Sequence, residues 1–293
     1  MKIMIYVPIF TNILVPVDGS HSSFYAAMLA SLIASRFKSK ITVIHCISHG
    51  CMHPELKAQY RLPTATLQKL EKVYLETGKK VILNFKEFFE GSGIRIKTRL
   101  ITCEDPAETI IQSVKNEGYD LVIIGNRAKE QDPAYYLGST TAKVVRHSEC
   151  PVFIAKKKTS FGKILVAVDG SKHANMALDY AIQLAKVFGA NLDLVHVEGD
   201  KLISIGGPEV ADCIGPIGEC IMKDAVSKVQ GVEFTKFLEY GRPQEVIIKL
   251  SNKENVDTIV VGSRGLSSIR RYLLGSVSDE VSMHARSSIL IVR

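Results

Sequence analysis

Short apolar runs alternate along the chain with segments that carry apolar residues on one helical face. Ile13–Val17 and Ile164–Val168 are apolar, mostly β-branched runs that end in Asp-Gly, which is typical of buried strands in a parallel sheet. After each run, apolar residues recur at i, i+4, i+7, i+8 and i+11, the spacing of one face of a helix. These residues are Ala26, Ala30, Ile33, Ala34 and Phe37 in the first case, and Ala177, Ala181, Leu184, Ala185 and Phe188 in the second.

The chain repeats one structural unit. The segment ILVPVDGS returns as ILVAVDGS after a shift of 151 residues, and LVIIG returns as TIVVG after a shift of 137 residues. The smaller second shift places 14 extra residues in the middle of the first copy, between Ile47 and Cys103. Such a repeat predicts two domains of one fold. We expect them at residues 1–157 and 163–293, joined by a polar linker.

Each copy predicts five strands with helices between them. The third strand is expected near Ile94–Ile101 in the first copy and near Val232–Leu238 in the second. Ser20 and Ser171 directly precede the first helix of each copy, where a serine hydroxyl can cap the first turn. Regular alternation of strands and helices predicts α/β domains, each with a five-stranded parallel sheet and helices on both faces.

The composition is that of a globular chain, with 46% hydrophobic and 23% charged residues among 293. No apolar run reaches the ~18 residues of a membrane span, so we expect none. The opening MKIMIYVPIF is interpreted as an N-terminal extension or an extra strand, because no small-residue cleavage site follows it. With no signal peptide or membrane span evident, we expect a cytoplasmic location. Six cysteines form no CxxC pair, and a chain of this length can bury a core without disulfides, so we expect reduced thiols.

The net charge of +7 suits an anionic ligand. The basic residues are dispersed, no basic stretch is interleaved with aromatic residues, and the chain has no Trp. These features disfavour nucleic-acid binding.

Glycines gather where ligands bind in open α/β sheets, beyond the carboxyl ends of the strands. Gly262 ends a predicted strand, Gly265 follows, and Gly275-Ser276 begins a predicted helix. A helix start offers unpaired N–H groups and a partial positive charge, which suit a phosphate. Arg264 adds a positive charge. The alternative is that these are only turn glycines, but Gly-Ser begins the corresponding helix in both copies. No Walker A sequence occurs in the chain.

The pattern Gly262-x-x-Gly265, nine residues, then Gly275-Ser276 resembles the ATP-binding signature of universal stress proteins. The resemblance covers both copies and nearly the whole chain. It implies two tandem Rossmann-like domains of the adenine nucleotide α-hydrolase-like type, which pair through their last strands as a pseudo-dimer. It also implies a bound adenine nucleotide, ATP or else AMP or ADP, with Mg²⁺ accompanying ATP. The ligand-holding residues implied for the second copy are Ala167, Asp169, Val197, Gly262, Arg264, Gly265, Gly275, Ser276, Val277 and Ser278.

The first copy departs from this signature. Ala128 replaces the second glycine, and the following segment carries Glu130 and Asp132. If the position needs a left-handed backbone, alanine costs about 1–2 kcal/mol, and negative charges oppose phosphate binding. We therefore expect weaker nucleotide binding here, or binding of AMP or adenosine alone. The alternative is that this copy binds ATP normally. The residues implied for it are Pro16, Asp18, Cys46, Gly125, Arg127, Gly138, Ser139, Thr140 and Thr141.

Two other chemistries are weaker hypotheses. His49, Cys51 and His53 alternate in a predicted loop, but no fourth ligand is evident and we expect no metal site. No set of metal-holding carboxylate, nucleophile and second-substrate pocket is identified, so we expect at most slow ATP hydrolysis. The favoured function is a nucleotide-binding stress-response regulator that acts on an unknown protein partner, with the nucleotide held mainly by the second domain. A slow ATPase, a nucleotide-independent scaffold or small-ligand carrier, and a homodimer of the chain remain open.

Overall fold

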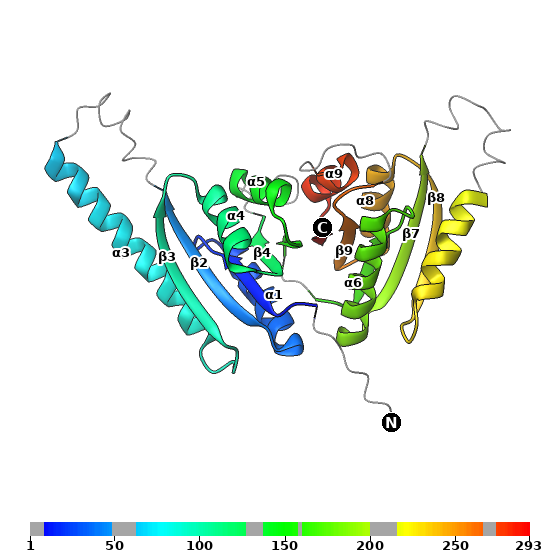
Figure 1. The fold of residues 1–293 in the computed structure, drawn as a ribbon, viewed down its shortest axis with the longest axis horizontal. Coiled ribbons are helices and arrows are strands. Elements are labelled where there is room, and N and C mark those ends of the chain that lie inside the picture. Colours follow the sequence, from blue (N-terminus) through cyan, green and yellow to red (C-terminus); the bar gives the residue numbers. More distant parts are fainter. Residues whose placement is uncertain (1–8, 49–62, 127–136, 158–159, 200–215, 266–273) are drawn as a thin grey trace.

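The computed structural model describes residues 9–48, 63–126, 137–157, 160–199, 216–265 and 274–293. Two α/β domains follow one another along the chain (Figure 1). The first contains β1 (Asn12–Pro16), α1 (His21–Phe37), β2 (Lys40–Ser48), α3 (Thr64–Phe89), β3 (Ile96–Cys103), α4 (Pro106–Glu117), β4 (Leu121–Gly125), α5 (Ser139–His147) and β5 (Val152–Ala155). The second contains β6 (Lys163–Ala167), α6 (Lys172–Phe188), β7 (Asn191–Gly199), a helix over 216–228, β8 (Phe234–Gly241), α8 (Pro243–Lys253), β9 (Thr258–Gly262), α9 (Ser276–His284) and β10 (Ser288–Val292).

One ten-stranded sheet runs through both domains in the order β3-β2-β1-β4-β5-β10-β9-β6-β7-β8. Every described pairing within a domain is parallel, as the sequence predicts. The pairing between domains is antiparallel and joins β5 to β10, with Ile154 opposite Ile289. The last strands therefore pair within the chain. In each half the strand order switches at the first strand, between β1 and β4 and between β6 and β9, where a ligand crevice is expected.

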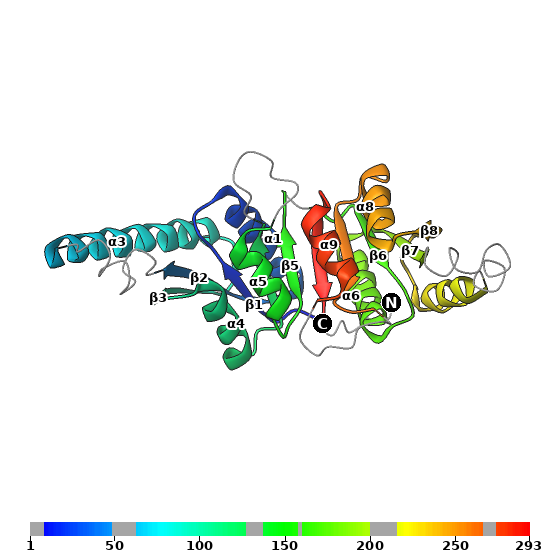
Figure 2. The ribbon, with the colours of Figure 1, turned by 90° about the horizontal axis from the view of Figure 1, so that it is seen from above.

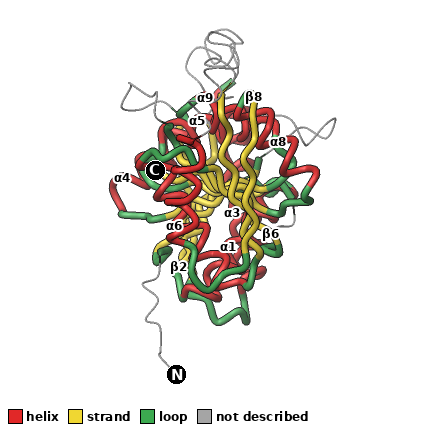
Figure 3. The backbone as a smooth tube through the Cα atoms, turned by 90° about the vertical axis from the view of Figure 1, so that its right-hand side faces the viewer, coloured by secondary structure: helices red, strands yellow, loops and turns green. Residues whose placement is uncertain are grey.

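Helices cover both faces of the sheet, and Figure 3 shows the strands at the centre with helices on either side. On one face α1, α3 and α6 contribute to an apolar cluster that crosses the domain boundary. The ring of Phe10 lies 5.4 Å from Tyr180, and Phe161 stacks on Phe188 at 4.2 Å. On the other face α4, α5, α8 and α9 cover a second cluster. The cores of the two domains are therefore continuous.

The local signals of the sequence explain the helix boundaries. Ser20 caps α1 by accepting from the N–H of Ser23, and Ser171 caps α6 by accepting from Ala174. Both caps confirm the prediction. The third strands, β3 and β8, start two residues later than expected. The pairing of β3 with β2 sets its limits, because its last residue, Cys103, lies opposite the last residue of β2.

The additional length of the first domain lies partly in α3, which runs for 26 residues. The described part of its counterpart covers 216–228. The N-terminal end of α3 extends beyond the strands, as Figures 1 and 2 show. Its buried residues are Gly78, Phe85 and Phe89, all in the second half of the helix. Among the described residues, no helix is both long and apolar enough to cross a membrane.

Reciprocal contacts join the last helix of each domain to the other domain. The Lys156 ammonium, just after β5, donates to the carbonyl of Ala285 at 2.7 Å, at the end of α9. Arg293, just after β10, donates to the carbonyl of Val145 in the last turn of α5. Each cation lies where the helix carries its partial negative charge. The two residues are equivalent by the repeat, so the contacts follow an approximate two-fold relation.

Candidate functional site

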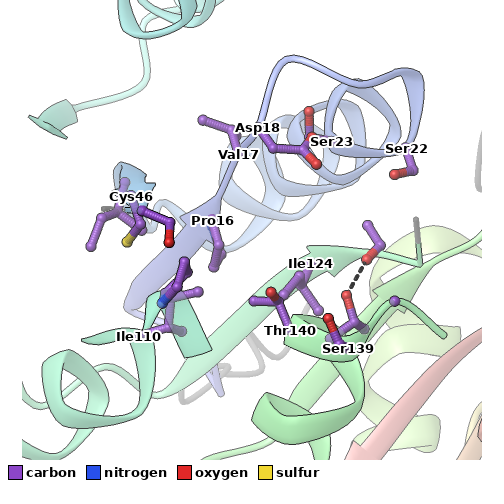
Figure 4. Close-up of a pocket in the computed structure, with 16 residues that line it drawn as sticks. Pro16, Val17, Asp18, Ser22, Ser23, Cys46, Ile110, Ile124, Ser139 and Thr140 are labelled. Carbon is purple, nitrogen blue, oxygen red and sulfur yellow. Dashed lines mark hydrogen bonds between the residues drawn. The ribbon is translucent and has the colours of Figure 1, made fainter. Parts of the chain in front are cut away.

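A cavity of about 280 Å³ opens at the carboxyl ends of the strands in the first domain (Figure 4). It lies where β1 and β4 separate, at the switch in strand order. Every residue that the sequence assigned to this site and that the structure describes lines the cavity; Arg127 lies outside the described residues. The residues brought together are Pro16, Asp18, Cys46, Gly125, Gly138, Ser139, Thr140 and Thr141.

Sequence reasoning missed half of the wall. Ser22 and Ser23 come from the first turns of α1, and Pro106 and Ile110 come from α4. The repeat contained a signal for Pro106, because proline recurs at the first position of the corresponding helix, α8. The remaining missed residues are apolar or small and lie within or directly after strands β1, β2 and β4: Val17, Ile44, Ser48 and Ile124.

An aspartate after the first strand of each domain is held by the cap of the following helix. The Asp18 carboxylate accepts from the N–H of Ser20 at 3.0 Å and from its hydroxyl at 2.5 Å. Asp169 accepts from the N–H of Ser171 at 2.9 Å. The helix N-terminus thus fixes the orientation of both carboxylates.

Cys46 gives the first-domain cavity a neutral sulfur. The pKa of its thiol is raised to about 12, first by burial and then by the charge and hydrogen bonding of the neighbouring Cys103, while Arg99 acts in the opposite direction. The thiol is therefore protonated at neutral pH. The Cys46 side chain packs against the apolar cluster, as Val197 does at the equivalent place in the second domain.

Glycine N-caps begin α5 and α9, the helices that follow the two glycine loops. Gly138 and Gly275 are extended, and neither helix receives a side-chain cap from the described residues. The N–H of Gly138 donates to Asn126 at 2.9 Å, and that of Gly275 donates to Ser263 at 2.8 Å. Each hydrogen bond joins the end of the fourth strand of a domain to the start of its last helix. Among the described residues, no side chain takes up the first helical N–H groups, which a ligand or solvent can therefore bind.

The buried hydroxyls one turn into these helices close the loops. The hydroxyl of Thr141 donates to the carbonyl of Gly125 at 2.8 Å. The hydroxyl of Ser278 lies 3.0 Å from the carbonyl of Gly275 and 3.3 Å from that of Ser263. These residues therefore shape the site through the backbone.

The loop glycines are required for close packing. A Cβ at Gly125 would lie 2.5 Å from the carbonyl oxygen of Ser22, and one at Gly262 would lie 2.7 Å from the carbonyl carbon of His173. Gly265 has no positive φ, so the left-handed cost considered from the sequence does not apply to it. A Cβ at Gly265 would instead lie 2.6 Å from a carboxylate oxygen of Asp169.

The second-domain residues lie at equivalent strand and helix ends. Ala167 ends β6 and Gly262 ends β9. Ala167, Val197 and Val277 are partly buried against the same apolar cluster. Arg264 differs from them, because it lines a separate cavity between the domains together with Arg293.

The structure describes only the start of the histidine-rich segment, where His45 lies in β2. His45 binds the carbonyl of Val17 at 2.7 Å, and His196 makes the same contact with Val168 at 2.7 Å. Both rings thus tie the second strand of a domain to the end of the first strand. His49, Cys51 and His53 lie outside the described residues. Within the described part of the chain, no group of three or more His, Cys, Asp or Glu side chains could hold a metal ion.

Comparisons with known proteins agree with this architecture. The model of the Universal stress protein family matches residues 10–156 and again residues 160–293. Universal stress protein Rv2623 of Mycobacterium tuberculosis is 23% identical over 296 residues, which cover 96% of each chain. Universal stress protein YxiE of Bacillus subtilis is 33% identical over 147 residues, covering 45% of this chain and 99% of YxiE. The crystal structure of a universal stress protein from Archaeoglobus fulgidus has a TM-score of 0.69 at 24% identity and covers 98% of this chain and 99% of that one.

Fold and cavity together define a tandem α/β protein whose halves are joined through one sheet and which has a ligand-sized cavity at a switch in strand order. The two family matches together cover nearly the whole chain. The chain belongs to the universal stress protein family.

Proposed function

We propose that this universal stress protein binds an adenine nucleotide and that the bound nucleotide regulates a protein partner. The observation that carries the proposal is the start of α5 and α9. Each helix begins at a glycine directly beyond the switch in strand order, and no described side chain caps the start of the helix. Such a helix end attracts phosphate through its N–H groups and its partial positive charge.

The rest of the cavity suits a nucleoside. Ile44, Ile110 and Ile124 form an apolar wall, against which a flat base can pack. Asp18 is held at the opposite side with its carboxylate oriented by Ser20 (Figure 4), where it can accept from a ribose hydroxyl. The volume of about 280 Å³ is near the lower end of the range for small-molecule pockets.

We propose further that the second domain holds the nucleotide more tightly. Its signature has glycine at position 265 beside the Asp169 carboxylate, whereas the first domain has Ala128 followed by Glu130 and Asp132. An added methyl group and two negative charges both oppose a phosphate.

Nucleotide binding at α9 would be transmitted to the other domain. Asp279 lies in the first turn of α9, beside the proposed phosphate position. Its carboxylate receives two hydrogen bonds from Arg146 of α5, at 3.1 and 3.2 Å. A phosphate that competes with Asp279 for positive charge would change the contact between the domains, and this change is the proposed regulatory signal.

The nucleotide content of the purified, heat-denatured protein tests the proposal. Chromatography and mass spectrometry should find about one ATP per chain, held by the helix start of the second domain. Gly275→Val should release it, and the matched variant Gly138→Val should retain it.

Two other outcomes of this measurement would contradict part or all of the proposal. Two nucleotides per chain would show that the first domain binds equally well. Absence of nucleotide, together with no binding of added ATP, would overturn the proposal and favour a scaffold or a carrier of another small ligand.

A further inference from the structure

Two strands lie at the ends of the ten-stranded sheet, β3 in the first domain and β8 in the second. β8 runs for eight residues, Phe234–Gly241, without a proline. It pairs with β7 on one side, and no described strand lies on its other side (Figure 1). Edge strands of this length are usually shortened, interrupted or covered, because their free N–H and C=O groups pair readily with another strand.

Alternate residues of β8 direct their backbone groups to this free side. The N–H of Leu192 in β7 donates to the carbonyl of Glu233, directly before β8, at 2.9 Å. Along a parallel pair, residues that bond to the neighbouring strand alternate with residues that do not. The even-numbered residues of β8 therefore point their N–H and C=O groups away from β7. These residues, which we call the edge row, are Phe234, Lys236, Leu238 and Tyr240.

The side chains of the edge row lie on one face of the sheet, the face that carries α6. Phe234, Leu238 and Tyr240 are 41%, 42% and 58% exposed. At the other end of the sheet, α3 packs on the equivalent row of β3. A Cβ at Gly78 of α3 would lie 2.9 Å from the side chain of Leu100, which is equivalent to Leu238. The described part of the second domain thus leaves exposed a row on which a long helix packs in the first.

The edge row is complementary to a second copy of itself. Antiparallel pairing about Phe237 places Phe234 of one chain opposite Tyr240 of the other, on both sides of the centre. The same register places Lys236 opposite Leu238, whose surface the lysine stem can cover. Each residue of the edge row then exchanges backbone hydrogen bonds with the residue opposite it. Aromatic residues opposite one another stabilise such pairs.

Other registers of the same pairing are less favourable. A shift by one residue would place the free backbone groups of one chain opposite groups that already bond to β7 in the other. A shift by two residues in one direction would place Lys236 opposite Lys236 of the second copy, where like charges repel. A shift by two in the other direction would leave Phe234 beyond the end of the paired strand. The register about Phe237 is therefore the one that pairs the whole edge row.

The chain already uses this kind of junction between its own domains. β5 and β10 meet as antiparallel edge strands, with Phe153 opposite Leu290. All residues of both strands are buried. Pairing of β8 with a second copy would continue the same sheet in the same way. Because the edge row matches itself in one register, the partner that it fits is a second copy of this chain.

We propose that two copies of this chain form a dimer through their β8 strands, which pair antiparallel about Phe237. Phe234 of each copy lies opposite Tyr240 of the other, and the sheet continues across a two-fold axis. The two edge rows cover each other on one face of the sheet. This interface is additional to the proposed nucleotide function and includes none of the residues assigned to the nucleotide.

Sedimentation velocity on the full chain, between about 1 and 200 μM, tests the proposal. We expect a monomer–dimer equilibrium with a Kd of about 10 μM, because a junction of one strand pair is a small interface. The double variant Phe234→Lys/Tyr240→Lys places lysines opposite one another and should be monomeric over this range. Phe234→Glu/Tyr240→Glu should be monomeric for the same reason, since it places glutamates opposite one another.

Mixing these two variants tests the register. In a mixed dimer each new lysine lies opposite a new glutamate, so an equimolar mixture should dimerise again, and less strongly at high salt. Val73→Lys/Leu83→Lys is the matched control. These two residues of α3 are 55% and 51% exposed and lie in the other domain, so this variant should dimerise as the wild type does.

Circular dichroism establishes that each variant is folded. If either double variant fails to fold, the single variants Leu238→Glu and Leu238→Lys carry the test, because position 238 lies opposite Lys236 in the proposed register. Leu238→Glu should dimerise at least tenfold more tightly than Leu238→Lys. Equal dimerisation of these two variants would contradict the register.

Three results would overturn the proposal. The first is a wild type that stays monomeric over the whole range, and the second is a mixture of the two charged variants that stays monomeric. The third is a monomeric Val73→Lys/Leu83→Lys, because the interface would then lie on α3. Oligomers larger than a dimer would also contradict it, since an antiparallel pair of β8 strands closes at two copies.

Discussion

The two domains place equivalent groups at the same strand ends and differ in what surrounds them. Both have an aspartate held by the cap of the next helix and a glycine N-cap on the last helix. The first domain has a thiol, Cys46, in its cavity wall, where the second has Val197. The second domain has two arginines beside its glycine loop, facing the interdomain cavity. The comparison teaches that the backbone sets where a ligand can bind, while the variable side chains set which ligand and how tightly.

The largest expected difference concerns thiol reactivity. In the native protein, iodoacetamide should modify Cys46 at least ~100-fold more slowly than Cys220, because only the thiolate reacts. Burial raises the pKa of Cys46 to about 12, whereas Cys220 is exposed. A mass-spectrometric time course at about pH 8 measures both rates. The rates should converge in denaturant, and equal rates in the native protein would contradict the described wall.

Adding a methyl group to the first glycine of the signature, Gly125 in the first domain or Gly262 in the second, should destabilise the domain that carries it. Gly262→Ala and Gly125→Ala should each lower the free energy of unfolding by about 2–3 kcal/mol, as overpacking does. The reason is the backbone of α6 or α1, which lies within 2.7 Å of the added atom. Urea denaturation measures the change.

Gly199→Ala is the control for these variants, because a Cβ there meets no atom within 4 Å. Its stability should change by less than about 0.5 kcal/mol. A similarly small change in Gly262→Ala would show that α6 and β9 do not approach as described.

The two reciprocal helix contacts should respond differently to pH. Burial lowers the pKa of Lys156 from 10.5 to about 8, so between these values the unfolded chain binds more protons than the folded one. Stability relative to Lys156→Met should therefore rise with pH, by about 1–2 kcal/mol between about pH 7 and pH 9. Denaturation at several pH values measures the difference.

Arg293→Met provides the comparison, because Arg293 titrates only near pH 10. Its stability difference from the wild type should stay constant between about pH 7 and pH 9. A parallel rise for both variants would show that Lys156 is not the group that titrates.

The smallest expected effect comes from exchanging the residue at the second glycine position of the signature, which is Ala128 in the first domain and Gly265 in the second. Ala128→Gly in a Gly275→Val background should raise the ATP affinity of the first domain by a factor of about three to ten, since removal of one methyl group is worth at most ~1.4 kcal/mol. Gly265→Ala in a Gly138→Val background should weaken the second domain by a similar factor. Titration calorimetry measures both. If the two domains bind ATP with equal affinity before the exchange, the prediction is wrong, because there is then no difference in affinity for Ala128 and Gly265 to explain.

Much of the fold is predictable because the repeat supplies each element twice. The apolar runs, the caps Ser20 and Ser171, and the parallel order all follow from local chemistry that the sequence displays. The glycine spacing and the family resemblance also identify half of the residues that line the first-domain cavity. The start of β3 was missed by two residues, because pairing with β2 rather than local propensity sets it.

The interdomain cavity was beyond such reasoning. Arg264 belongs by sequence to the glycine loop, yet its place in a wall with Arg293 depends on how β5 meets β10. Residues this far apart in the chain are brought together by tertiary structure alone. The packing role of Gly262 could not be predicted from the sequence either, because it depends on how closely α6 approaches this glycine.

The antiparallel junction has a consequence for the order of folding during synthesis. β5 is completed early, but its partner β10 is the last strand of the chain. All four residues of β5 are buried in the final structure, so the nascent first domain exposes an apolar edge strand until the second domain is made. Exposed edges of this kind pair with other chains, and contacts between distant segments form slowly. The interval between completion of the two halves is therefore the time when the chain is most prone to aggregation.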